Sequence, residues 1–207
     1  GNISFDGSFT GFTTDFVTYG KVRTNLGNIR TDISFRPEKP NRYRIKGLLT
    51  GRDVNLGELT GNTDLLGKLS MQTNVDGYAY SLNRFAGNLT GKIDSIEINR
   101  YKYRNIALNG LFTEKTWDGS VKISDENLKM YLQGLFNFSG KLPEFDFTLD
   151  VAEANLYKLN FDRIDTTSSL AMLLTSNFKG SNFDNLDGEI KLLKSNFIKY
   201  NKNLELN

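Results

Sequence analysis

The amino-acid sequence predicts an all-β protein, a curved antiparallel sheet with at most one or two short helical turns. Apolar and polar residues alternate over many short stretches, and this alternation is the period of an extended strand. Gly, Asn and Asp separate the stretches, while helical periodicity is poor nearly everywhere. The three prolines, Pro37, Pro40 and Pro143, stand between strand patterns, where a missing backbone donor costs little. These observations together predict a meander of antiparallel strands.

In the first half of the chain, strand patterns recur at short spacing. Apolar residues, Thr or Gly occupy every second position over residues 29–35, 43–49 and 69–75. The pair Asp76-Gly77 then predicts a tight turn of the hairpin type. The alternation resumes from Tyr78, so we expect a hairpin centred on this pair.

The second half continues the pattern over residues 106–112, 117–123, 128–138 and 145–151. Asp146, Thr148 and Asp150 stand between the apolar residues of the last stretch and form a clean polar face. Because strand side chains alternate sides, we expect a sheet with one apolar face and one face in water. Asp146 and Asp150 are therefore interpreted as solvated side chains rather than as a catalytic acid and base.

Glycines inside the strand patterns predict where the sheet curves. Gly110, Gly119 and Gly134 recur beside apolar residues, and a glycine at such a position lets a strand bend or bulge. The best helical candidate is residues 153–160, which allow one or two turns, and residues 14–19 allow less. The chain therefore offers little helix that could cover an apolar sheet face.

Composition excludes several classes of function. The 26 basic and 24 acidic residues are spread along the 207-residue chain and leave a net charge of +2, so no surface for nucleic acid is expected. The absence of Cys and His removes thiol nucleophiles, imidazole bases and the usual zinc sites. We therefore predict a protein that is not an enzyme and holds no cofactor or metal.

Five stretches from residue 99 onward carry a resemblance to a known family, and residues 11–20 and 24–27 are similar to an upstream phrase of the same family. The five stretches read NRYKYRNIALNGL over residues 99–111, WDGSVKISDENL over 117–128, GLFNFS over 134–139, PEFDF over 143–147 and DVAEANLYKL over 150–159. In this order they resemble TamB-like proteins of the AsmA superfamily, especially those of Bacteroidetes. Trp117 replaces the commoner Phe, and Asn155 replaces the commoner Asp.

The resemblance implies an elongated, U-shaped sheet with a hydrophobic groove, known as a β-taco. Such a segment belongs to the periplasm, within a protein anchored in the inner membrane of a Gram-negative bacterium. The parent protein is expected to reach an outer-membrane partner of the Omp85/BamA type through parts that have no counterpart here. We expect residues 1–207 to be a single segment of this longer repetitive protein, with no internal domain boundary.

The resemblance implies either the transfer of phospholipid between the two membranes or help in the assembly of outer-membrane proteins. We favour phospholipid transfer, so acyl chains are the expected ligand. Burying one methylene is worth about 0.8 kcal/mol, and a sixteen-carbon chain therefore gains on the order of 12 kcal/mol before ordering costs. The residues predicted to line the groove alternate on one face of the second-half strands. They are Ile106, Leu108, Phe112, Val121, Ile123, Leu128, Met130, Leu132, Phe136, Phe138, Phe145, Phe147, Leu149 and Val151.

Two alternatives stay open at this stage. One is a scaffold or chaperone whose sheet edge templates strands of outer-membrane proteins, which requires unpaired edge backbone more than an apolar face. The other is an ordinary β-sandwich or a transmembrane barrel, since alternation is common to both.

Overall fold

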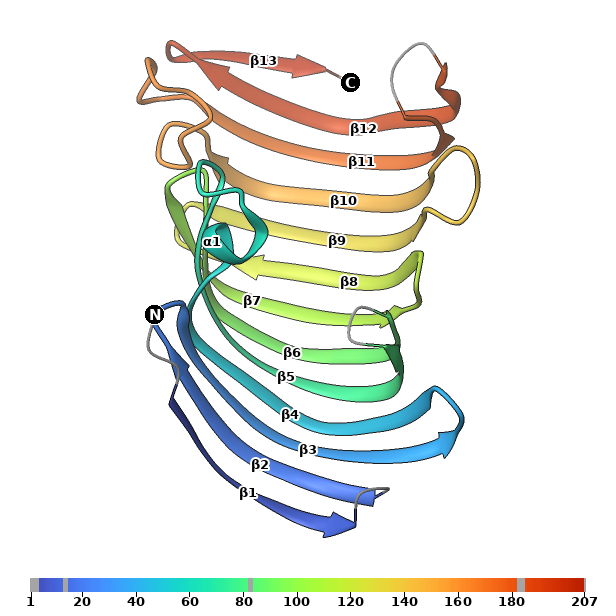
Figure 1. Cartoon of the computed structure of the whole chain (residues 1–207). Helices are drawn as coiled ribbons and strands as arrows, with labels where there is room; N and C mark the ends of the chain where they lie inside the picture. Colours follow the sequence, from blue (N-terminus) through green and yellow to red (C-terminus); the bar gives the residue numbers. More distant parts are fainter. Residues whose placement is uncertain (1–3, 13–14, 82–83, 182–184, 207) are drawn as a thin grey trace. The chain divides into compact units, whose positions relative to one another are not determined.

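The computed structural model describes residues 4–12, 15–81, 84–181 and 185–206. These residues form thirteen strands, which follow one another in the sheet in the order of the chain, and one short helix (Figure 1). The predicted fold class is confirmed, because the protein is an open antiparallel sheet with very little helix. Figure 1 also shows that strands within each part of the sheet bend along their length, as a curved sheet requires.

The chain divides into two compact units, and strand β7 (Tyr101–Phe112) contributes residues to both. The first unit comprises residues 1–102 and 107–114, and the second comprises residues 103–106 and 115–207. The elements of the first unit are β1 (Ser4–Phe12), β2 (Asp15–Thr24), β3 (Gly27–Lys39), β4 (Arg42–Asn55), α1 (Leu56–Thr60), β5 (Leu66–Ser81) and β6 (Arg84–Ile98). Those of the second unit are β8 (Thr116–Ser124), β9 (Leu128–Asn137), β10 (Glu144–Asn155), β11 (Ser169–Lys179), β12 (Asp187–Lys199) and β13 (Lys202–Leu206). That the chain is a single segment of a longer protein stays a prediction.

In the first unit, antiparallel pairing places small and apolar residues opposite one another. Ile33 of β3 stands opposite Gly47 of β4, which stands opposite Val75 of β5, which in turn faces Leu89 of β6. Val75 is buried, while Ile33 and Leu89 are half-buried. This row shows that the alternation read from the sequence is the side-chain pattern of a two-faced sheet.

The predicted hairpin at Asp76-Gly77 is wrong. Strand β5 runs through this pair without a turn, and Gly77 stands opposite Gly87 of β6. A Cβ on either glycine would overlap the backbone of the other strand and the ring of Phe85. Gly77 and Gly87 are therefore required because the two strands approach closely beside the ring of Phe85. From the sequence alone, a glycine needed for such an approach cannot be distinguished from a glycine in a turn.

The glycines of the second unit also act by close approach. Gly119 of β8 stands opposite Gly134 of β9, and the register continues past both without a bulge. A Cβ on Gly134 would overlap Phe147 of β10 and the neighbouring backbone. A bulge at Gly119 or Gly134 is thus not observed, whereas register shifts do occur on β10 between Val151 and Glu153 and on β12 opposite Leu174.

The one helix, α1, lies where no helix was predicted. The Asn55 side chain caps it by accepting a hydrogen bond from the backbone N–H of Glu58 at 3.2 Å, and Gly61 ends it with a φ of 72°. Of the predicted turns, residues 156–160 form turns rather than a helix, residues 15–19 lie in β2, and Thr14 lies outside the described residues. No described helix combines the length and apolar character that a membrane span needs.

Few hydrophobic side chains of the described residues are fully buried. They are Val54, Leu69, Val75, Tyr103, Ile106, Val151, Ala154 and Leu159. The other apolar residues on the strands keep contact with solvent, because a single sheet layer has no second layer to remove its face from water.

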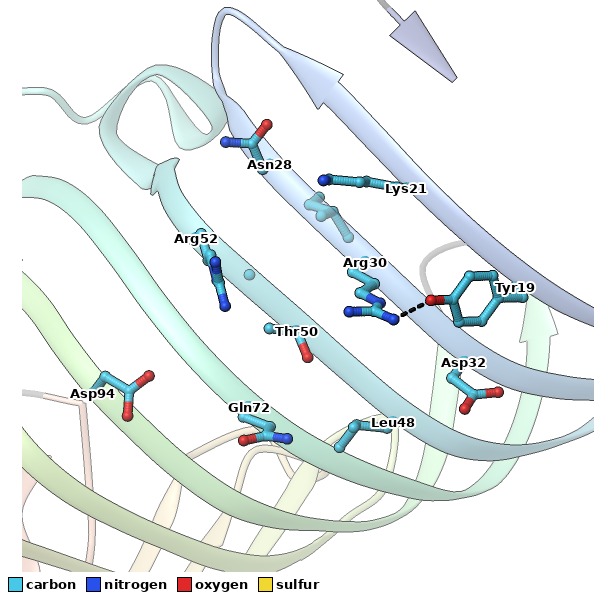
Figure 2. Close-up of a pocket in the computed structure, with 12 residues that line it drawn as sticks. Tyr19, Lys21, Asn28, Arg30, Asp32, Leu48, Thr50, Arg52, Gln72 and Asp94 are labelled. Atoms are coloured by element: carbon cyan, nitrogen blue, oxygen red, sulfur yellow. Dashed lines mark hydrogen bonds between the residues drawn. The ribbon is translucent and has the colours of Figure 1, made fainter. Parts of the chain in front are cut away.

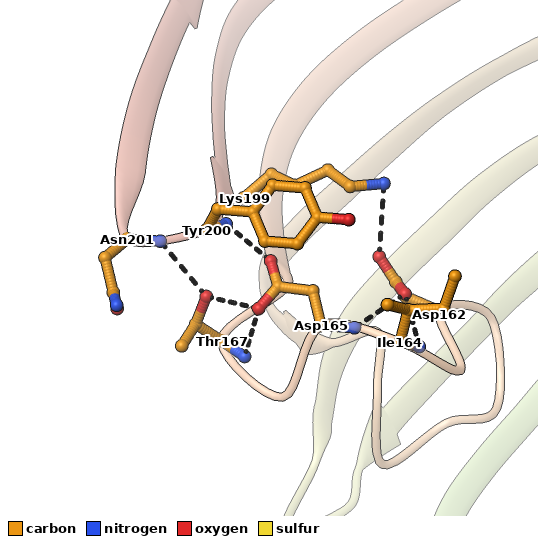
Figure 3. A network of polar contacts seen from close by, with 7 residues as sticks. All are labelled: Asp162, Ile164, Asp165, Thr167, Lys199, Tyr200 and Asn201. Atoms are coloured by element: carbon orange, nitrogen blue, oxygen red, sulfur yellow. Dashed lines mark hydrogen bonds and ion pairs between the residues drawn. The ribbon is translucent and has the colours of Figure 1, made fainter.

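A polar network fixes the connection between β10 and β11 (Figure 3). The Asp162 carboxylate accepts hydrogen bonds from the backbone N–H groups of Ile164 at 2.9 Å and Asp165 at 3.1 Å, and lies 3.4 Å from the Lys199 ammonium. These backbone donors and Lys199 lower the pKa of Asp162 from 3.8 to about 2. The carboxylate thus ties this connection to the end of β12.

The second carboxylate of the network, Asp165, reaches the turn between β12 and β13. It is buried and accepts hydrogen bonds from the Thr167 hydroxyl at 2.7 Å, the Thr167 N–H at 2.9 Å and the Tyr200 N–H at 2.5 Å. The Thr167 and Tyr200 donors lower the pKa of Asp165. Both carboxylates are therefore bound in their ionised form.

The network makes stability depend on pH in the acid range. Because the folded pKa of Asp162 is depressed, its contribution is complete above its unfolded value near 3.8 and is lost as pH falls toward about 2. We expect Asp162→Asn to lower the free energy of unfolding at pH 7, and the difference from the natural protein to shrink between about pH 4 and pH 2. Urea unfolding at several pH values measures this, and a difference independent of pH would contradict it.

Candidate functional site

The candidate site is a continuous set of apolar side chains on one face of strands β8 to β11, here called the apolar strip. All its members lie in the second unit, and they occupy alternating positions of each strand. The apolar strip comprises Trp117, Val121 and Ile123 of β8, Met130, Leu132 and Phe136 of β9, Phe145, Phe147, Leu149 and Val151 of β10, and Met172, Leu174 and Phe178 of β11.

Strand register brings these side chains together in rows across the sheet. In the central row, Val121 stands opposite Leu132, which faces Leu149, which faces Leu174. The next row runs from Ile123 through Met130 and Val151 to Met172. Residues directly opposite one another in an antiparallel pair share a face, so the strip is unbroken over four strands.

An aromatic cluster closes one end of the strip. Phe136 stacks on Phe147 with ring centres 5.5 Å apart, and it lies 5.2 Å from Trp117. Phe145 meets Phe136 edge-on at 5.7 Å and lies 4.9 Å from Phe178. Such ring pairs add to the stability gained from burial and hold the four strands at this end in fixed register.

The strip is neither a dry core nor a fully exposed surface. Every member is half-buried except Val151, which is 6% exposed. The described residues of the second unit contain no helix that could lie over the strip. Part of the surface of these large apolar side chains stays in contact with water. Covering it with another apolar group would therefore be favourable.

The opposite face of the same strands carries most of their charged side chains, together with the exposed Tyr131 and Leu135 of β9. The Lys129 ammonium lies 2.6 Å from the Glu153 carboxylate, and the Lys179 ammonium lies 2.7 Å from the Glu144 carboxylate. The hydrogen bond from Lys179 lowers the pKa of Glu144. Exposed ion pairs contribute little to stability, but they show that this face is solvated, as the polar positions in the sequence predicted.

A hollow of about 490 Å³ lies on this face beside the strands of the strip. Gln133, Asp146 and Thr148 are among the residues that line it. Tyr131 and Leu135 also line it, so the hollow has a mixed polar and apolar lining.

Most of the predicted groove residues on β8, β9 and β10 belong to the strip. Leu128 continues it at one end of β9, where it stands opposite Ala154. Phe138 lies beyond the end of β9 and is 54% exposed, although its ring meets Phe145 edge-on at 5.8 Å.

The predicted residues of β7 are placed differently. Ile106 belongs to the second unit and is buried, at 5% exposure. Leu108 and Phe112 belong to the first unit and are half-buried. The apolar strip as defined here therefore does not include them, and their predicted contact with a ligand stays a prediction.

Trp117 and the β11 residues Met172, Leu174 and Phe178 line the strip but were not among the predicted groove residues. Trp117 did lie in a strand pattern, at the position that faces Phe136. The run from Leu170 to Leu174 is continuously apolar, so it lacks the alternation that marks a two-faced strand. Its register with β10 is what places Met172 and Leu174 on the strip.

Comparison with known proteins adds no relative. No protein-family model, curated protein or solved structure matches this chain.

Proposed function

We propose that the apolar strip binds acyl chains and that this chain is a non-enzymatic groove segment that helps to conduct phospholipid between the inner and outer membranes. The proposal places the chain in the periplasm, within an inner-membrane-anchored TamB-like protein of the AsmA superfamily. The observation that carries it is the half-buried state of the strip across four neighbouring strands. The resemblance of residues 99–159 to that family supplies the choice of ligand and compartment.

The strip has the chemistry that an acyl chain needs. Its members are aliphatic or aromatic. None of the residues in the rows that cross β8 to β11 through these members is charged. Covering one side of a sixteen-carbon chain is worth on the order of 6 kcal/mol, half the value for complete burial. The rows of Ile123 and Val121 are chemically alike, while the next row has Phe147 as its one large apolar side chain, beside Gly119, Gly134 and Ser176.

A second candidate function is a scaffold for assembly of outer-membrane proteins with an Omp85-type partner. Strand β13 pairs with β12 only over residues 195–199. Residues 187–194 of β12 are exposed and, among the described residues, have a strand on one side only. This free edge is the feature that strand addition by a client protein would use.

Photo-crosslinking in the presence of phospholipid vesicles separates the two candidates. A photoreactive residue at Leu132 or Phe147 should capture phospholipid, whereas one at Gln133 or Asp146 should not. The control positions adjoin the test positions on the same strands and line the hollow of about 490 Å³, so lack of space cannot explain a negative result there. Equal capture at all four positions would refute the assigned faces, and capture of client protein at β12 without lipid capture on the strip would favour the scaffold.

A further inference from the structure

A second hollow, of about 410 Å³, lies in the first unit across strands β2 to β6 (Figure 2). Most of the residues that line it are polar or charged, although Ile29 and Leu48 also contribute apolar surface. The charged residues that line it are Lys21, Arg30, Arg52, Asp32 and Asp94. Its size falls within the range of sites that hold small molecules.

Strand pairing concentrates positive charge in this hollow. Lys21 of β2 stands directly opposite Arg30 of β3, a like-charge pair that disfavours the sheet, and on its other side it stands opposite Asp6 of β1. Arg52 of β4 stands opposite Asn28, two residues before Arg30 on β3. Figure 2 shows the three cationic side chains over the neighbouring strands β2, β3 and β4.

Among the described residues, no ion pair neutralises these three cations. Within the described first unit, carboxylates pair with other basic residues, as Asp76 does with Arg44 and Glu114 does with Arg84. Arg30 instead donates a hydrogen bond to the Tyr19 hydroxyl, and its guanidinium lies 5.1 Å from the centre of the Tyr19 ring. Asp32 and Asp94 line the hollow without forming an ion pair to Lys21, Arg30 or Arg52, so the lining carries three positive and two negative charges.

We infer that this hollow binds a small polar molecule bearing a phosphate group. Guanidinium forks such as those of Arg30 and Arg52 match phosphate oxygens in pairs, and the Lys21 ammonium adds a point charge. The Asn28 and Gln72 amides and the Thr50 hydroxyl supply hydrogen-bonding groups for hydroxyls on the rest of the ligand. A phosphate seated between Lys21 and Arg30 converts their repulsion into two favourable contacts.

Two sources supply this chemistry, a free phosphate ester and the headgroup of a phospholipid. The mostly polar lining favours the free ester, because the hollow offers no apolar surface comparable with the strip for the acyl chains of a lipid. The site belongs to the first unit and does not depend on the proposed function of the apolar strip.

The test is calorimetric titration of the whole chain with glycerol 3-phosphate, with glycerol as the uncharged control. We expect saturable binding of glycerol 3-phosphate alone, weakened about tenfold or more in Lys21→Gln and in Arg52→Gln. The matched control Lys68→Gln removes an exposed lysine of β5 that does not line the hollow, and it should change the affinity less than twofold.

A second measurement guards against misfolded variants. Lys21→Gln removes both the repulsion by Arg30 and the attraction by Asp6, so it should change the unfolding midpoint in urea little, as should Lys68→Gln. Binding of phosphatidylglycerol vesicles with the same sensitivity to Lys21→Gln, without binding of glycerol 3-phosphate, would assign the site to a lipid headgroup. Absence of binding to both probes, or equal losses in Lys21→Gln and Lys68→Gln, would overturn the inference.

Discussion

Replacement of Leu132 by Asp should reduce the phospholipid that co-purifies with the protein at least tenfold. Leu132 lies in the central row of the strip, between Val121 and Leu149. A carboxylate there must be dehydrated when an acyl chain covers it, and no basic side chain belongs to that row. Extraction with organic solvent followed by mass spectrometry measures the amount of lipid per mole of protein.

The matched control for this experiment is Gln133→Asp. It adds the same charge one residue along β9, on the solvated face, and should leave the lipid content unchanged. Leu132→Ala separates binding from stability, because it removes packing without adding a charge and should keep most of the lipid. If Leu132→Asp and Gln133→Asp retain the same amount of lipid, the strip is not the site of acyl-chain binding.

Gly134→Ala should destabilise the second unit by about 1–3 kcal/mol, although it adds a single methyl group. The new Cβ would overlap Phe147 and the backbone of β10, and neither can move without opening the register between β9 and β10. Urea unfolding followed by circular dichroism gives the free energy of unfolding directly.

Gly140→Ala is the matched control for that measurement. Gly140 lies in the connection after β9, where the nearest atom to an added Cβ is the Leu142 carbonyl oxygen at 3.2 Å. We expect a change within about 0.5 kcal/mol there. Equal effects of the two substitutions would show that Gly134 has no special role in strand approach.

Alternation of side chains made the architecture predictable from the sequence. Period-two patterns located strands β7 to β10, and the polar positions Asp146, Thr148 and Asp150 identified the solvated face. The wrong turn at Gly77 and the absence of a bulge at Gly134 have one physical cause. Gly77 and Gly134 serve close approach between strands, and only the partner strand reveals this, since Asp-Gly in isolation favours a turn.

The remaining misses concern local signals and long-range register. Asn55, Glu58 and Gly61 form the capping pattern of a short helix, so α1 was predictable from the sequence. The part of β11 in the strip was not, because Leu170 to Leu174 are apolar without alternation and their faces depend on pairing with β10. The charged hollow likewise arises from register, which joins residues of five strands.

The polar network around Asp162 and Asp165 lay outside any sequence pattern. The carboxylates are held by backbone N–H groups of residues in their own connection and in the β12–β13 turn. Contacts of this kind require the folded path of the chain, which composition and spacing do not specify.

The most direct test of the central claim is lipid photo-crosslinking at adjacent positions of β9 and β10. The acyl-chain account predicts phospholipid adducts at Leu132 and Phe147 and none at Gln133 and Asp146. Because each pair lies one residue apart on one strand, the comparison depends only on which face the lipid covers. Adducts at all four positions in equal yield, or at Gln133 and Asp146 alone, would contradict the account.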